Sequence, residues 1–341
     1  MIHFWLPESP DEAEIRAWDP DGEPQRFASG AGHNVLELYR RLFARGLVVS
    51  LGAEVPRGAR LVVLYAPSLF RPETLRRGLS VIRQARGRFA LIRADVPPGF
   101  RLPVRPVVEF MPIRATVTGE WQRWLPPLPQ RGLLPRREER FGRIRSLAFK
   151  GNPENAHPEL KTELWKAELA ELGIEWWLDA PAIWDGSDQR WHDFSEVDAV
   201  LCTRNPAMRT GLERKPATRL INAWRAGCVP FADRAPAYEE LGTDGEDVHF
   251  IDRPANCLPL LDDLNRDPDR LQRFELRIRA RGQDYPPTEI LARWQEALLE
   301  AADARQCKGW RSFARTAKAA AARVAVTRHA VPWPRKGRSR Q

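Results

Sequence analysis

The sequence predicts an α/β protein made of two doubly wound domains that face each other across a cleft. Short runs rich in β-branched and aromatic residues alternate with helical patterns in both halves of the chain, and this alternation is typical of parallel sheets with right-handed crossovers. A proline-rich segment interrupts the alternation near the middle. The length of 341 residues is enough for two domains with a core each.

Each half carries its own series of strand and helix patterns. The predicted strands are 2–6, 47–52, 59–65 and 88–94 in the first half and 144–151, 174–179, 197–204, 228–233 and 247–252 in the second. The predicted helices are 33–46 and 72–87, then 159–172, 216–226, 258–264 and two further helical stretches that end at about residue 305. Two parallel sheets follow from this order.

The pattern breaks between Trp121 and Arg143, where prolines at positions 126, 127, 129 and 135 disfavour both helix and sheet. We assign residues 126–143 as the interdomain linker. The N-terminal domain is then 1–125, the C-terminal domain is 144–305, and residues 306–341 form a tail.

The formal net charge of +9 is concentrated in that tail. Residues 305–341 contain eleven Lys and Arg and no Asp or Glu, which leaves 43 basic and 45 acidic residues in the rest of the chain. Because nucleic-acid binding depends on clustered charge, a near-neutral body argues against a nucleic-acid partner for the two domains.

The four cysteines lie far apart with no C-x-x-C pair, so neither a zinc site nor a disulfide framework is indicated. The longest apolar runs are far shorter than a membrane-spanning helix, and the first residues show no charged-then-apolar leader. We therefore expect a cytoplasmic protein that binds no structural metal.

The helix predicted at 216–226 has features of a phosphate site. Lys215, Arg219 and Asn222 share one side of it, which we expect to face solvent, while Leu220 and Trp224 share the packing side. A helix N-terminus that follows a strand favours a phosphate, and two nearby cations add to that field. We expect a nucleoside diphosphate here, with Asn222 bonded to a ribose hydroxyl.

Two further strand ends and one loop fall at the same edge of the predicted sheet. Lys150-Gly151 follows one strand and Arg204 follows another, and the loop after CVPF brings Tyr238 and Glu239. Since ligands of open α/β sheets bind outside the carboxyl ends of the strands, we add these residues to the donor site.

KPATRLINAWRAGCVP and the loop after it resemble the donor-binding segment of the GT-B glycosyltransferases, and the linker WLPPLPQRGLLPR is similar to those of bacterial members. The resemblance implies two facing Rossmann-like domains, with a nucleotide sugar bound by the C-terminal one and the acceptor by the N-terminal one. It implies no metal and no cofactor, since the nucleotide sugar is a substrate.

The Glu-x7-Glu motif of many retaining members is absent, because Arg214 and Asn222 stand at the two positions. Retention and inversion of configuration therefore both stay open. An inverting enzyme needs a base for the acceptor hydroxyl. His33, in SGAGHN, is our first candidate and Asp95 our second.

The family layout also implies a last helix that crosses back onto the N-terminal domain. We expect it at 310–324, where Trp310, Phe313 and Val324 recur at helical spacing. The basic face of this helix is a candidate for peripheral contact with the anionic inner membrane, and a solvated tail without a partner is the alternative.

The function expected from these observations is transfer of a sugar from a nucleotide-sugar donor to a bacterial surface glycan or its lipid-linked precursor, as in polysaccharide biosynthesis. One alternative is a sugar-nucleotide epimerase of the same fold. The other is a non-enzymatic protein that binds nucleic acid or another polyanion through the basic tail.

Overall fold

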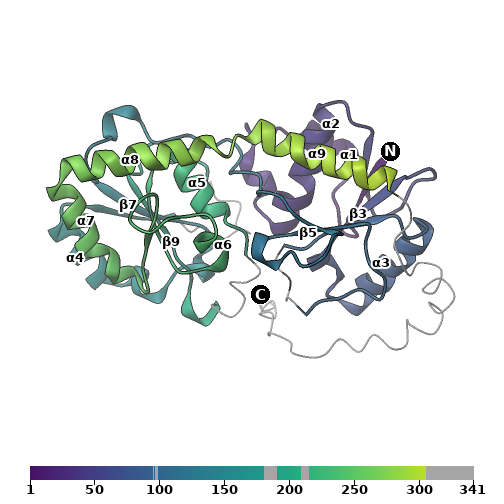
Figure 1. The fold of residues 1–341 in the computed structure, drawn as a ribbon, viewed down its shortest axis with the longest axis horizontal. Helices are drawn as coiled ribbons and strands as arrows, with labels where there is room; N and C mark the ends of the chain where they lie inside the picture. Colours follow the sequence, from purple (N-terminus) through teal and green to yellow (C-terminus); the bar gives the residue numbers. More distant parts are fainter. Residues whose placement is uncertain (95, 97–98, 180–189, 209–214, 305–341) are drawn as a thin grey trace, which may run out of the picture.

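The computed structural model describes all residues except 95, 97–98, 180–189, 209–214 and 305–341 (Figure 1). The described chain forms two α/β halves, each built on one parallel sheet. The two halves lie side by side along the long axis of the molecule. The predicted fold class is confirmed.

The N-terminal sheet has six strands in the order β2-β1-β3-β4-β5-β6. These are β1 (Ile2–Trp5), β2 (Val49–Gly52), β3 (Leu61–Tyr65), β4 (Phe89–Ile92), β5 (Val108–Met111) and β6 (Gln122–Trp124). Its helices are α1 (Glu12–Ala17), α2 (Glu37–Ala44) and α3 (Pro72–Gln84).

Both faces of this sheet are buried, because successive residues of one strand enter different cores. Phe4 and Val63 belong to the large core that includes Leu38 and Leu42 of α2, whereas Trp5 belongs to a second core with residues of α3. Parallel strands covered on both sides read as continuous apolar runs, which is the pattern of LVVLY in β3.

The C-terminal sheet has five strands in the order β11-β10-β9-β7-β8. These are β7 (Ser146–Lys150), β8 (Glu175–Asp179), β9 (Ala199–Cys202), β10 (Val229–Ala232) and β11 (His249–Phe250). Its helices are α4 (Glu163–Glu171), α5 (Thr218–Ala226), α6 (Pro236–Glu239), α7 (Cys257–Arg266) and α8 (Pro268–Gln283). In both sheets the first strand lies between the second and the third, which creates a topological switch point.

The nine predicted strands are all present, with their ends shifted by one or two residues. The sequence analysis missed β5 and β6, which lie among prolines, and β6 falls inside the segment where the pattern breaks. It also missed the short helices α1 and α6. The helix predicted at 216–226 is α5, and Gly227 ends it in the left-handed conformation at φ 73°.

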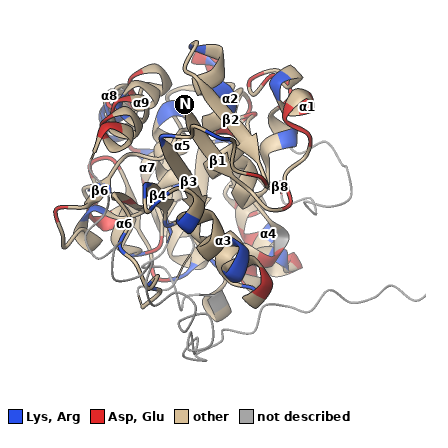
Figure 2. Cartoon of the chain, turned by 90° about the vertical axis from the view of Figure 1, so that its right-hand side faces the viewer, with Lys and Arg blue, Asp and Glu red and all other residues tan. Residues whose placement is uncertain are grey.

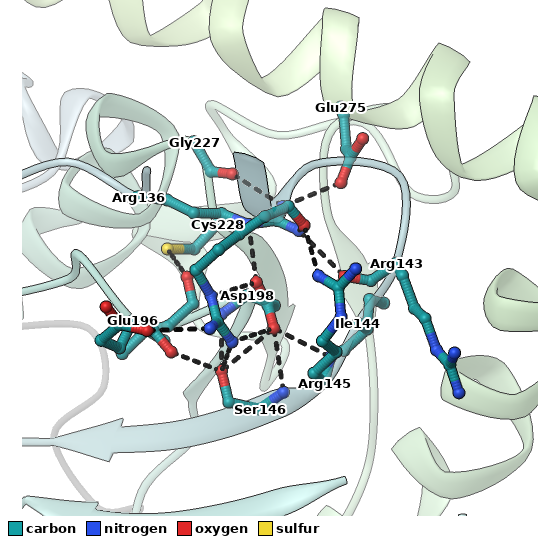
Figure 3. A network of polar contacts seen from close by, with 12 residues as sticks. Arg136, Arg143, Ile144, Arg145, Ser146, Glu196, Asp198, Gly227, Cys228 and Glu275 are labelled. Atoms are coloured by element: carbon teal, nitrogen blue, oxygen red, sulfur yellow. Dashed lines mark hydrogen bonds and ion pairs between the residues drawn. The ribbon is translucent and has the colours of Figure 1, made fainter. Parts of the chain in front are cut away.

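The linker is held by two buried arginines, one on each domain. Arg131 donates to the backbone oxygens of Pro24 (2.9 Å) and Phe27 (2.5 Å) in the N-terminal domain. Arg136 reaches into the C-terminal domain, where its Nε lies 2.9 Å from Asp198 Oδ1 and its Nη1 lies 2.8 Å from Glu275 Oε1 (Figure 3). The proline-rich segment is therefore an anchored connection.

The network around Arg136 lies at the amino-terminal edge of the C-terminal sheet, where β7 and β9 begin (Figure 3). Asp198 Oδ2 accepts hydrogen bonds from the backbone N–H groups of Arg145 (2.8 Å) and Ser146 (3.0 Å) and from Arg140 Nη2 (2.7 Å). A buried carboxylate with this many donors is well compensated.

The helix that returns to the N-terminal domain is α9 (Pro287–Asp303). Figure 1 shows α8 and α9 in line along one side of the molecule, with α8 over the C-terminal half and α9 over the N-terminal half. Trp294 of α9 packs against Phe110 with 4.6 Å between ring centroids, and its Nε1 donates to Pro126 O (3.2 Å). The stretch 310–324, to which the sequence analysis assigned this role, lies outside the described residues.

None of the helices in the described part of the chain combines the length and the hydropathy that crossing a membrane requires.

Candidate active site

The carboxyl-terminal edges of the two sheets face each other. Glu240, which follows α6, accepts hydrogen bonds from the backbone N–H groups of Arg114 (2.9 Å) and Ala115 (3.0 Å). Those two residues follow β5 of the N-terminal sheet. Ligands of open α/β sheets bind outside this edge, so the space between the two edges is the candidate site.

Lys150, at the end of β7, is already engaged in an ion pair. Its Nζ lies 2.8 Å from Asp179 Oδ2 and donates to Arg190 O at 2.9 Å. The ammonium group also lies 5.1 Å from the centre of the Phe194 ring. A phosphate contact from Lys150 stays a prediction, and the ammonium group would make it beside the contact with Asp179 or in its place.

Gly151 lies against the guanidinium group of Arg219. The backbone of Gly151 has φ 153°, and a Cβ there would stand 2.5 Å from Arg219 Nη2. Arg219 stacks on the Phe149 ring at 4.7 Å and donates to Thr203 O at 2.9 Å. Glycine thus allows the loop after β7 to approach Arg219 closely.

The expectation that Arg219 and Asn222 face solvent is wrong. Asn222 is buried and Arg219 is partly buried, and burial lowers the pKa of the Arg219 guanidinium, which is also close to the charge of Arg204. The helical spacing placed the two residues on one side correctly, but that side packs against the ends of β7 and β9 and against the linker.

Buried polar atoms gather beside Arg219. Thr203 Oγ1, Arg204 Nε and the Tyr238 hydroxyl are buried without a hydrogen-bond partner among the described residues. Burial raises the pKa of Tyr238 to about 12, against the opposing charges of Arg204 and Arg219. Because buried polar groups in proteins are normally paired, this cluster is suited to receive an anion or another acceptor-rich ligand.

Asp233 lies close to this cluster, and the sequence analysis missed it. It directly follows β10, its side chain is buried, and its charge acts on both Tyr238 and Arg219. Its position directly after a predicted strand could have identified it. Lys150 and Arg204 also stand at strand ends, but the sequence analysis selected them for their positive charge.

Three predicted donor-site residues are not among the unpaired buried atoms of that cluster. Asn222 Oδ1 accepts from the backbone N–H of Gln130 in the linker at 2.7 Å, so this oxygen holds the linker. Glu239 is exposed and pairs with Arg234 at 3.4 Å. Lys215 precedes α5 and is partly buried. Their contacts with a nucleotide stay predictions.

On the N-terminal side, His33 lies in a π-helical turn (Gly32–Leu36) directly before α2. Its Nδ1 is 3.4 Å from Glu37 Oε2 and 3.1 Å from Arg131 Nη1, and its side chain is 19% exposed. Gly32 is required there, since a Cβ would stand 2.6 Å from Phe27 O. π-Helical turns are frequent at functional sites.

Glu37 is buried and charged. Burial opposes its ionisation, but the hydrogen bond with His33 and the charge of Arg131 outweigh burial and lower its pKa. Arg131 Nη1 lies 3.0 Å from Glu37 Oε2. A carboxylate in this position can orient an imidazole.

The sequence analysis selected His33 and missed the residues that support it. Glu37 could have been found, because residues four apart on a helix are neighbours. Arg131 could not be found in this way, because the residues that it contacts in the N-terminal domain are about a hundred positions away in the sequence. Phe27, for example, is 104 residues away. Asp95, the second candidate base, lies outside the described residues.

A pocket opens where the two domains meet the linker. It is lined by Pro24, Gln25 and Ala28 of the N-terminal domain, Gln130 and Arg131 of the linker, and Trp191 and His192 of the C-terminal domain. Both domains therefore contribute to one concave surface. No group of three or more His, Cys, Asp or Glu side chains suited to a metal occurs in the part of the chain that the structure describes.

No protein-family model matches the sequence, and no curated protein matches it significantly. Solved structures do match it across most of its length. HepE of Anabaena, in complex with UDP-glucose, shares 13% identity and a TM-score of 0.51, and the match covers 88% of this chain and 99% of HepE.

Two further solved structures match to a similar extent. AviGT4, a glycosyltransferase involved in avilamycin A biosynthesis, shares 15% identity and a TM-score of 0.51 over 90% of this chain and 99% of its own. Sucrose-phosphate synthase from Thermosynechococcus elongatus shares 10% identity and a TM-score of 0.59 over 88% and 98%. The fold of this chain is that of the GT-B glycosyltransferases, as the resemblance implied.

Proposed function

We propose that this protein is a glycosyltransferase that binds its nucleotide-sugar donor at the carboxyl edge of the C-terminal sheet. The observation that carries the proposal is the cluster of Thr203, Arg204, Arg219 and Tyr238, which places buried polar atoms without partners beside two cations. The shared fold supports it, since HepE was crystallised with UDP-glucose.

The chemistry of sugar transfer fits these groups. The bond between the anomeric carbon and the diphosphate breaks, the acceptor oxygen bonds to that carbon, and the diphosphate leaves with added negative charge. Arg204 and Arg219 would offset this charge, and the Tyr238 hydroxyl would donate to a phosphate oxygen. Positively charged side chains can serve this purpose without a metal ion.

On the acceptor side, His33 would take the proton from the attacking hydroxyl, with Glu37 holding the imidazole. His33→Ala should lower kcat by roughly 100-fold or more while the affinity for the nucleotide stays unchanged. An unchanged kcat would remove His33 from the proposal. Asp95 stays the second candidate, and retention or inversion stays open.

The acceptor we propose is a bacterial surface glycan or its lipid-linked precursor, with the basic tail as a further contact to an anionic membrane. An epimerase would convert the sugar nucleotide with no acceptor present, which distinguishes it from a transferase. A polyanion-binding protein would bind DNA in a salt-dependent manner and show no selectivity among nucleotides.

A thermal-shift screen with UDP, GDP, CDP, dTDP and their sugar conjugates tests the donor site. A ligand at 100 times its dissociation constant stabilises the folded protein by about 2.7 kcal/mol. We expect a shift with one nucleotide family. The absence of any shift would favour the polyanion-binding alternative or an inactive relative.

Three variants locate the binding site. Arg219→Ala and Lys215→Ala should each weaken nucleotide binding by roughly 10- to 100-fold, because a lost charge-assisted contact costs about 1.5–3 kcal/mol. The matched control is Lys166→Ala, an exposed cation on α4 that pairs with Glu163. Wild-type affinity in both site variants, with unliganded melting temperatures close to wild type, would contradict this placement.

A further inference from the structure

A strongly basic segment lies within the N-terminal domain. Residues 53–106 contain eleven arginines, no lysine and three acidic residues, Glu54, Glu73 and Asp95. The net charge of the chain outside the tail is close to zero all the same, because the other residues contain more acidic than basic side chains. Clustered charge of this size marks a surface that attracts anions.

The fold places many of these arginines on the outside of α3. The helix buries Leu75, Leu79 and Ile82 in the second core of the N-terminal domain. Gly78 lets it pack closely, since a Cβ there would stand 2.5 Å from a methyl carbon of Leu69. The opposite side of the helix is free to face outward.

Arg76, Arg77 and Arg83 project from that outer side and are exposed. Figure 2 shows α3 on the side of the molecule that faces the viewer, with basic positions marked in blue along its ribbon. Glu73 is the one acidic residue of the helix. Arg71, before the helix, pairs with the exposed Glu8 at 3.3 Å.

An apolar side chain completes this surface. Phe70 is 43% exposed and contacts Phe100 edge to face, with 5.6 Å between ring centroids. We call Phe70, Arg71, Arg76, Arg77 and Arg83 the α3 face. Phe70 and Arg71 follow β3, and the carboxyl ends of parallel strands share one edge of the sheet, so this end of the α3 face lies at the edge that faces the C-terminal domain.

We propose that the α3 face docks on the surface of an anionic phospholipid bilayer. Arginines attract the phosphate groups of the lipids, and an exposed aromatic ring among them can enter the boundary of the acyl chains. A soluble polyanion would satisfy the arginines and leave Phe70 in water, so the combination favours a bilayer. A convex helix surface also suits a flat partner.

Docking in this way would hold the opening between the two domains near the membrane. If the proposed function is correct, a lipid-linked acceptor would then reach His33 from the bilayer without leaving it. The docking itself does not depend on nucleotide binding, so the two proposals can fail separately.

Co-sedimentation of the full-length protein with vesicles tests the docking. The vesicles contain phosphatidylcholine alone or phosphatidylcholine with phosphatidylglycerol. We expect binding to the anionic vesicles only. The triple variant Arg76→Ala/Arg77→Ala/Arg83→Ala should bind roughly 100-fold more weakly, since each basic residue near the surface contributes about fivefold. Phe70→Ser should weaken binding without any change in charge.

The matched control removes three arginines from α8. Arg270, Arg273 and Arg277 are exposed, and Leu276, which is 61% exposed, lies among them. The α8 surface thus has the same combination of basic and apolar side chains as the α3 face. Their replacement by alanine changes the net charge equally and should leave vesicle binding at the wild-type level. An equal loss in both triple variants would mean non-specific attraction and would overturn the proposal.

Two other results would also overturn it. The first is wild-type vesicle binding by the α3 triple variant, above all if Arg335→Ala/Lys336→Ala/Arg338→Ala in the tail abolishes binding. The second is retention on DNA or heparin through the α3 arginines with no binding to anionic vesicles. Nucleotide-induced thermal shifts in the α3 variants should equal those of the wild type, which shows that each variant is folded.

Discussion

The two edges of the C-terminal sheet carry buried or partly buried arginines in opposite circumstances. At the amino edge, Arg136 and Arg140 meet the carboxylate of Asp198, which also accepts backbone hydrogen bonds (Figure 3). At the carboxyl edge, Arg219 stacks on Phe149, while Thr203 Oγ1 and the Tyr238 hydroxyl have no hydrogen-bond partner among the described residues.

The difference separates residues that stabilise the fold from residues that can bind a ligand. A buried charge with a full set of partners contributes to stability only while all partners are present. A buried polar atom without a partner costs free energy in the unliganded protein and gains a bond when a ligand arrives. The amino edge is therefore structural, and the carboxyl edge is the candidate site.

The largest expected effect comes from the amino edge. Arg136→Ala leaves Asp198 and Glu275 buried without their common partner, which should lower the free energy of unfolding by about 3–5 kcal/mol. Urea unfolding measures it. The control is the neighbouring Arg137→Ala, because Arg137 is 56% exposed and its ion pair with Glu196 should contribute less than about 1 kcal/mol. Equal effects would contradict the structural role of the amino edge.

The second prediction concerns His249 of β11, where acid should lower the free energy of unfolding without acting on the residues of either edge. Burial lowers the pKa of His249 to about 4, and the charge of Arg270 acts in the same direction while that of Asp244 opposes it. The imidazole is stacked between Phe231 and Phe274.

The unfolded chain protonates this histidine near pH 6.5, whereas the folded protein resists protonation down to about pH 4. The free energy of unfolding should therefore fall as the pH drops from 6.5 to 4, by up to about 3 kcal/mol for this residue. His249→Phe keeps the stacking and should flatten the pH dependence, as followed by urea unfolding at several pH values. His3, whose pKa burial also lowers to about 4, accounts for part of the remaining slope. A variant profile parallel to the wild-type profile would refute this assignment.

The smallest expected effect tests the carboxyl edge directly. Tyr238→Phe removes a hydroxyl that has no partner, so stability should change by less than about 1 kcal/mol, while nucleotide affinity should fall several-fold. Calorimetric titration with the nucleotide selected by the screen measures the affinity.

Tyr39→Phe is the matched control for that change. The Tyr39 hydroxyl donates to Glu12 at 2.7 Å and accepts from Arg16 at 2.9 Å, so its removal should lower stability and leave nucleotide affinity unchanged. If Tyr238→Phe instead destabilises the protein and spares the affinity, then the two edges do not differ as we infer.

Most of the fold could be predicted from the sequence because strands buried on both faces form uninterrupted apolar runs, such as LVVLY. β6 could not, since it is a three-residue edge strand next to prolines. The return helix was expected at 310–324 because the aromatic spacing there is regular, although Trp294 of α9 makes that contact with the N-terminal domain.

The candidate site could be predicted only in part. Strand ends indicated Gly151 and Arg204, because a parallel sheet gathers the ends of its strands at one edge, and the N-terminus of the helix that follows a strand indicated Arg219. The helical spacing showed which residues of α5 share a side, but not that Phe149 and the linker would cover that side. Long-range partners such as Arg131 and Glu37 become neighbours only in the folded chain.

The chain passes between the two domains twice, once in the linker and once between α8 and α9. Asn222 fixes the first crossing to α5, and Trp294 ties the second to the first through Pro126 O. Two attachment points define an axis. We expect movement of one domain against the other to be mainly a rotation about that axis, which would change the distance between Arg219 and His33.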